Sequence, residues 1–167
     1  AAEAFHGLED FLAEHLDMIE PGLTLVKTEF HLANPNGASG FLDIFARAVD
    51  GQLVIIEIKR TNSAAREAIQ ELYKYAALLR EKYLLKETEY RLILLSVEWH
   101  ELLVPYSEFA PSAPYEIWAG EIVRGPDCLP VEIKRVEPIA LAAHRKLAVR
   151  HFLWGFVDDA SASAAVP

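Results

Sequence analysis

The sequence predicts an α/β protein with a mixed central β-sheet flanked by helices. Two stretches carry apolar residues at helical spacing, and several short apolar runs are bounded by turn residues. The composition is ordinary for a globular protein, with 52% hydrophobic and 25% charged residues. At 167 residues we expect a single domain over 1–158 and a flexible C-terminal tail over 159–167.

The first third of the chain predicts a helix, a strand and a loop. Residues 5–19 form the helix, because apolar side chains recur at three- and four-residue spacing: Phe5, Leu8, Phe11, Leu12, Leu16 and Ile19. Pro21-Gly22 ends it. A strand over 23–32 follows, and the Asn-Pro-Asn-Gly run within 33–40 predicts a loop.

The middle of the chain predicts a hairpin and a long helix. Two strands, 41–48 and 53–59, surround an Asp50-Gly51 turn. The second strand is apolar on both faces, which is typical of a central strand. Residues 63–83 then predict a helix with one apolar stripe.

The last part predicts a strand over 91–97, an irregular or short helical stretch over 105–114, and an antiparallel pair over 115–123 and 131–136. A helix over 139–157 closes the fold. Within the pair, Val-Glu-Ile-Lys-Arg at 131–135 nearly repeats residues 56–60. We predict no functional site at this near-repeat. The strand before it carries Trp118 at the position where a partner carboxylate would have to lie, and Pro130 predicts an edge strand.

Charge and cysteine content restrict the function classes. The 16 Lys and Arg face 25 Asp and Glu, so the net charge of −9 argues against a protein that coats DNA non-specifically. No apolar run approaches the ~18 residues of a membrane span, so we expect no membrane partner. The single cysteine, Cys128, excludes an internal disulfide and a cysteine zinc site, and favours a cytoplasmic location.

The hairpin brings charged residues together on a strand that is otherwise apolar. Glu57 and Lys59 are two residues apart, so their side chains share a face. A two-residue loop would pair Asp43 with Ile58 and turn it to the other face. A three-residue loop, Val49-Asp50-Gly51, pairs Asp43 with Glu57 and gives Gly51 the left-handed position. We predict the three-residue loop, because it clusters the polar groups and requires the glycine.

Two carboxylates and an ammonium group at one place indicate metal-assisted hydrolysis. Oxygen ligands from Asp43 and Glu57 suit Mg²⁺ or Mn²⁺, with water and substrate phosphate completing the shell. Lys59 would position or activate a water molecule. This combination predicts hydrolysis of a phosphodiester bond.

At these residues the chain resembles the PD-(D/E)xK nuclease superfamily, and within it the C-terminal nuclease domain of the NucS endonucleases. The match is Asp43, thirteen intervening residues, and then Glu-Ile-Lys-Arg at 57–60. It extends upstream to residues 8–12 and 19–23, and in all covers about 3–79. The resemblance implies a restriction-endonuclease-like core and a metal-dependent nuclease acting on DNA, with Asp43, Glu57 and Lys59 at its centre.

The resemblance also implies supporting residues. Asp43, Glu57 and the backbone carbonyl of Ile58 are the implied metal ligands, with Glu9 of the opening helix as an extra carboxylate. It further implies Gln70 as a catalytic residue, and Arg60, Arg66 and Tyr73 as substrate-binding residues.

The family helix carries a Gln followed four residues later by a Tyr, whereas here Lys74 follows Gln70 at that distance. An alignment on Tyr75 would instead place Glu71 at the Gln position. Helical geometry puts Gln70 and Tyr73 on one stripe and turns Glu71 and Lys74 to solvent, so we predict Gln70 and Tyr73.

We therefore expect a divalent-metal-dependent deoxyribonuclease that uses Mg²⁺ or Mn²⁺. Its partner is DNA, single-stranded, branched or duplex, and the chain is a homodimer or part of a larger protein. A catalytically inactive module of the same fold, binding nucleic acid or a protein, is the alternative. A module without any nucleic-acid role is the third hypothesis, and the negative charge favours it.

Overall fold

The computed structural model describes residues 7–141, with the side chains of 62–66 left out. It confirms an α/β fold built on a mixed six-stranded sheet, and none of the described helices is long and apolar enough to cross a bilayer. The elements in chain order are α1 (Leu8–Glu14), a 3-10 turn (Leu16–Met18), β1 (Thr24–Leu32), β2 (Gly40–Arg47), β3 (Leu53–Lys59), α2 (Asn62–Tyr83), β4 (Tyr90–Ser96), α3 (Leu103–Phe109), a second 3-10 turn (Ala110–Ser112), β5 (Glu116–Arg124) and β6 (Pro130–Val136).

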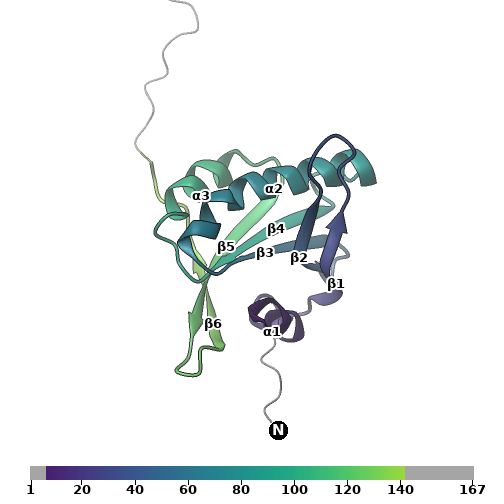
Figure 1. The fold of residues 1–167 in the computed structure, drawn as a ribbon. Helices are drawn as coiled ribbons and strands as arrows, with labels where there is room; N and C mark the ends of the chain where they lie inside the picture. The colour runs from purple at the N-terminus through teal and green to yellow at the C-terminus, as the bar shows by residue number, and fades with distance from the viewer. Residues whose placement is uncertain (1–6, 142–167) are drawn as a thin grey trace, which may run out of the picture.

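The strands lie in the sheet in the order in which they occur in the chain. β1, β2 and β3 are antiparallel neighbours, β3, β4 and β5 are parallel, and β6 returns antiparallel to β5. Parallel neighbours need a crossover connection, and α2 provides it between β3 and β4. Figure 1 shows α2 and α3 over one face of the sheet and α1 against the other.

Two apolar clusters cover the faces of the sheet, and β3 contributes to both. Ile55 belongs to the cluster beneath α2, together with Leu72 and Leu79 of that helix. Ile56 and Ile58 belong to the cluster beneath α1. The prediction of a central strand buried on both faces is therefore confirmed.

The predicted opening helix is shorter than expected. It divides at His15, whose backbone (φ −124°, ψ 46°) is not helical, and a 3-10 turn follows. The ring Nδ1 of His15 lies 2.8 Å from the carbonyl oxygen of Phe11, in the preceding turn. The predicted closing helix and tail, from residue 142 onward, lie outside the described residues.

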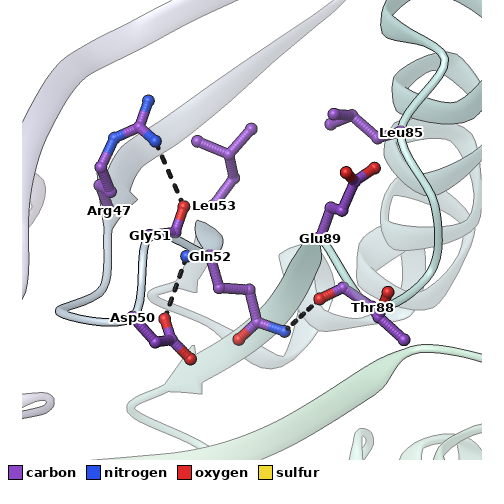
Figure 2. Close-up of a pocket in the computed structure, with 8 residues that line it drawn as sticks. All are labelled: Arg47, Asp50, Gly51, Gln52, Leu53, Leu85, Thr88 and Glu89. Atoms are coloured by element: carbon purple, nitrogen blue, oxygen red, sulfur yellow. Dashed lines mark hydrogen bonds between the residues drawn. The ribbon is translucent and has the colours of Figure 1, made fainter.

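The hairpin between β2 and β3 closes through the predicted three-residue loop. The Ala48 amide donates to the Gln52 carbonyl (2.9 Å) and the Gly51 amide donates to the Ala48 carbonyl (3.0 Å). Gly51 has a φ of 90°, in the left-handed region. Figure 2 shows this loop, in which the Asp50 carboxylate accepts a hydrogen bond from the Gln52 amide.

Replacing Gly51 with Val is expected to destabilise the protein by about 1–2 kcal/mol, the cost of the left-handed backbone for a residue with a Cβ. A Cβ on Gly51 would meet no atom within 4 Å, so the loss comes from the backbone alone. Urea unfolding measures it, and Gly51→Asn is the control because Asn tolerates this conformation. Equal stability of Gly51→Val and Gly51→Asn would show that the loop does not hold Gly51 in the left-handed region.

Candidate active site

Asp43 lies where β2 and β3 separate. The two strands pair from Arg47–Leu53 to Ile44–Ile56, and continuing this register by one residue sets Asp43 opposite Glu57. The Asp43 carboxylate accepts a hydrogen bond of 2.7 Å from the backbone amide of Ile58. This bond fixes the first carboxylate beside β3.

Glu57 and Lys59 extend from β3 toward α2 and are buried. Lys59 Nζ lies 2.8 Å from Glu57 Oε1 and also forms an ion pair with Glu71 of α2. Glu57 is 3% exposed and Lys59 8% exposed. The second carboxylate oxygen of Glu57, Oε2, is buried and accepts no hydrogen bond within the described part of the chain.

The pKa values of Asp43, Glu57 and Lys59 are all raised, through burial and through the charges of their neighbours. Burial, and then the charge of Asp43, raise the pKa of Glu57 well above its ordinary value. Burial also raises the pKa of Asp43, against the effect of the Ile58 amide. Burial alone would lower the pKa of Lys59, but the carboxylates of Glu57 and Glu71 outweigh it and the pKa is raised. Lys59 is therefore a protonated donor at neutral pH.

Glu57→Gln is expected to stabilise the metal-free protein at pH 8. A carboxyl group whose pKa is raised by folding adds stability below its unfolded pKa, and this stability is lost as the pH rises through the folded pKa. The melting temperature of the variant in EDTA should exceed that of the wild type by about 2–4 °C at pH 8, with the difference shrinking toward pH 5. Glu132→Gln, on exposed β6, is the matched control. A pH-independent difference would contradict the assigned cause.

The side of α2 that faces Asp43, Glu57 and Lys59 carries Glu71. The prediction that Glu71 points to solvent is wrong, because its carboxylate pairs with Lys59. Gln70 is exposed, and Tyr73 is half exposed and packs edge-on against Phe109, with ring centroids 4.6 Å apart. The apolar stripe that packs α2 on the sheet has a polar flank on each side. Helical periodicity alone did not show which flank meets the carboxylates.

Tyr75, like Glu71, lies at the site although no role was predicted for it from the sequence. Its hydroxyl donates to the carbonyl of Phe41 (3.0 Å), two residues before Asp43. Burial, and then the charges of Glu57, Glu71 and Asp43, raise its pKa, so it stays protonated. A Cβ on Gly40 would lie 2.6 Å from the Tyr75 ring, which explains the glycine at the start of β2. The tyrosine four residues after Glu71 was the signal that could have identified this pair.

Glu9 and Arg60, predicted as metal ligand and substrate contact, are joined to each other. Arg60 Nε donates to Glu9 Oε1 at 2.8 Å, and Nη2 contacts the other carboxylate oxygen. Ile58 lies between Glu57 and Lys59, with its amide bound to Asp43. The side chain of Arg66 lies outside the described side chains.

The near-repeat on β6 is separate from this cluster. Glu132 and Lys134 are exposed on the edge strand, as predicted. A pocket of about 390 Å³ at the opposite end of β3, drawn in Figure 2, is lined by Arg47, Gln52 and Glu89 among others, and by none of the predicted site residues.

Asp43 and Glu57 fit a divalent cation that takes part of its shell from solvent or substrate. The free, buried Oε2 of Glu57 and the raised pKa values of both carboxyl groups are what a cation would relieve. No group of three or more His, Cys, Asp or Glu side chains within residues 7–141 is arranged to hold a metal. Mg²⁺ commonly binds through one or two carboxylates and keeps several waters, so two carboxylates are sufficient.

A mixed sheet with this Asp and Glu-x-Lys arrangement defines the class as a PD-(D/E)xK-type nuclease fold. Residues 5–99, more than half of the chain, match the family model of the endonuclease NucS C-terminal domain, and the chain belongs to this family.

Several known proteins are similar to the chain over its first half. Endonuclease NucS of Corynebacterium efficiens is 37% identical over 82 residues, covering 49% of this chain and 33% of the relative. Endonuclease NucS of Thermococcus kodakarensis is 30% identical over 76 residues, covering 46% and 28%. The matched part thus spans about a third of the length of these relatives. A repair endonuclease from Pyrococcus abyssi has a similar structure (TM-score 0.47, 18% identity, 70% of this chain and 48% of that one).

Proposed function

We propose that this chain is a divalent-metal-dependent nuclease that hydrolyses phosphodiester bonds of DNA. The observation that carries the proposal is the buried cluster of Asp43, Glu57 and Lys59, in which one Glu57 oxygen has no partner among the described residues. The family supports the reaction class, since relatives are named endonucleases. The single cysteine fits a reducing cytoplasmic compartment for this activity.

Asp43 and Glu57 would hold Mg²⁺ or Mn²⁺, with the carbonyl of Ile58 as a further ligand. When bound, the ion would polarise the phosphate and stabilise the charge of an in-line displacement. The chain prepares this site by holding two carboxylates together in a buried place, and the Ile58 amide fixes the orientation of one of them. A cation would also offset the net charge of −9 that otherwise repels DNA.

Lys59 would orient the attacking water and donate to a phosphate oxygen. Its raised pKa favours the role of a donor over that of a general base. Glu71 keeps its ammonium group in place from α2, and Tyr75 holds the end of β2 on which Asp43 lies. We therefore assign Glu71 and Tyr75 to organising the site.

The other predicted residues lie at the edge of the Asp43–Glu57–Lys59 cluster, and their roles are proposals. Gln70 and Tyr73 are accessible to DNA on the exposed flank of α2. Arg60 and Arg66 would contact phosphate groups, and Glu9 could bind metal only after releasing Arg60.

Incubation of the purified chain with labelled single-stranded, branched and duplex DNA tests the proposal. We expect cleavage with Mn²⁺ or Mg²⁺ and none in EDTA. Binding of DNA without cleavage under any metal condition would favour the inactive module. Neither binding nor cleavage would favour a module without a nucleic-acid role.

A further inference from the structure

A cleft of about 470 Å³ lies between the start of α1, the residues after β3, and the turn joining β5 to β6. Its lining combines apolar side chains with two arginines: Leu8, Phe11, Leu129, Pro130, Arg60 and Arg124. We call it the hairpin cleft. Part of its wall, including Arg124, Leu129 and Pro130, comes from the β5–β6 hairpin, which is outside the part of the chain that matches the family model.

The hairpin cleft opens at the same edge of the sheet as the candidate active site. β3, β4 and β5 are parallel, so their carboxyl ends share that edge. Arg60 directly follows Lys59, and Arg124 ends β5. Figure 1 shows the β5–β6 hairpin extending past the sheet beside α1. Lys59 faces α2 and the cleft adjoins α1, so a DNA strand at Lys59 would pass around this edge of the sheet to reach the cleft.

The two arginines are available to an anion. Arg60 is fixed by Glu9 through Nε and Nη2, yet its side chain remains 53% exposed. Arg124 is exposed, and its side chain forms no ion pair or hydrogen bond within residues 7–141. Glu9 offsets the charge of Arg60, and the carboxylates of Asp10 and Asp127 accept hydrogen bonds from the Gly7 and Leu129 amides at the rim. Arg124 is therefore the cation through which the cleft would attract an anion.

The apolar wall fits the sugar and base of a nucleotide. Phe11 is half-buried, stacks on His15 with ring centroids 4.2 Å apart, and lines the cleft with Leu129. Arginines that bind phosphates next to an apolar or aromatic surface are the usual combination in sites for single strands. In a duplex the base faces are covered by stacking, so this wall is useful only to an unpaired base.

We propose that the hairpin cleft binds an unpaired nucleotide of the DNA strand that flanks the scissile bond, with its phosphate on Arg60 and Arg124. This proposal rests on the proposed nuclease function and adds to it a substrate contact from the second half of the chain.

Two variants test the proposal in a Lys59→Gln background, which prevents cleavage during the measurement. Arg124→Ala removes the free positive charge, and Leu129→Glu places a carboxylate in the cleft. Lys134→Ala is the matched control, since Lys134 is exposed on the same hairpin but does not line the cleft. Binding of a fluorescein-labelled 30-nucleotide single strand and of its duplex is measured in Mn²⁺ at several salt concentrations.

We expect Arg124→Ala and Leu129→Glu to weaken single-strand binding about 3–10-fold, with a smaller effect on duplex. Arg124→Ala should also reduce the slope of log K against log salt concentration by about 0.7. If Arg124→Ala and Leu129→Glu bind the single strand as tightly as Lys134→Ala, the cleft is not a DNA-binding site. If the protein with Lys59 intact still cuts DNA in that case, the nuclease proposal is unaffected. If the two variants lose as much affinity for duplex as for the single strand, the ligand of the cleft is not an unpaired nucleotide. Absence of both binding and cleavage in the wild type would overturn both proposals.

Discussion

Lys59→Gln is expected to lower the rate of DNA cleavage by about 10³-fold, with Asp43→Asn and Glu57→Gln causing losses at least as large. In the proposed mechanism the three side chains would act on one reacting phosphate, so the triple variant should lose little more than the most damaged single variant. Asp43→Asn and Glu57→Gln keep the shape of the side chain, so they leave no cavity at the site. Single-turnover cleavage of labelled DNA gives the rates, and circular dichroism checks the fold.

The β6 near-repeat supplies matched controls for these variants. Glu132→Gln and Lys134→Gln make the same chemical changes in an exposed Glu-x-Lys pair and should leave the rate unchanged. A triple variant that cuts DNA as fast as the wild type would place the reaction elsewhere in the protein.

Mn²⁺ is expected to raise the melting temperature of the wild type by on the order of 5–10 °C at 100 times its dissociation constant, because binding stabilises the folded state by mass action. A bound metal ion would also offset the burial and the Asp43 charge that raise the pKa of Glu57. Differential scanning fluorimetry with and without Mn²⁺ measures the shift.

Asp43→Asn removes one of the two charges and should abolish most of this shift. Asp50→Asn, in the loop at the other end of the hairpin, is the control and should retain it. Equal stabilisation of the wild type and Asp43→Asn would mean that the ion binds outside the predicted pair.

The hairpin register could be predicted from the sequence because local rules determine it. A strand alternates its faces residue by residue, so only an odd-length loop sets Asp43 and Glu57 on one face. Gly51 indicated the three-residue loop, which needs a left-handed residue at this position, and the φ of 90° at Gly51 confirms it. The same locality explains why β3 was correctly predicted as a central strand.

Contacts between distant segments could not be predicted in the same way. Glu9 and Arg60 are 51 residues apart, and nothing in their local sequence showed that α1 would pack so that their side chains form an ion pair. The choice between the Gln70 and Glu71 flanks of α2 depends on how the helix lies over the sheet. Glu71 meets Lys59 because that flank lies over β3, a relation between two packed elements that periodicity does not contain.

The proposed reaction depends on one divalent ion held between Asp43 and Glu57. Diffraction data collected at the manganese absorption edge, from crystals grown with Mn²⁺, would locate this ion. We predict an anomalous peak about 2.1 Å from a carboxylate oxygen of each residue, with Glu57 contributing the Oε2 atom that has no partner among the described residues. An ordered Mn²⁺ bound at other residues, with no peak between Asp43 and Glu57, would show that these two carboxylates are not the metal site.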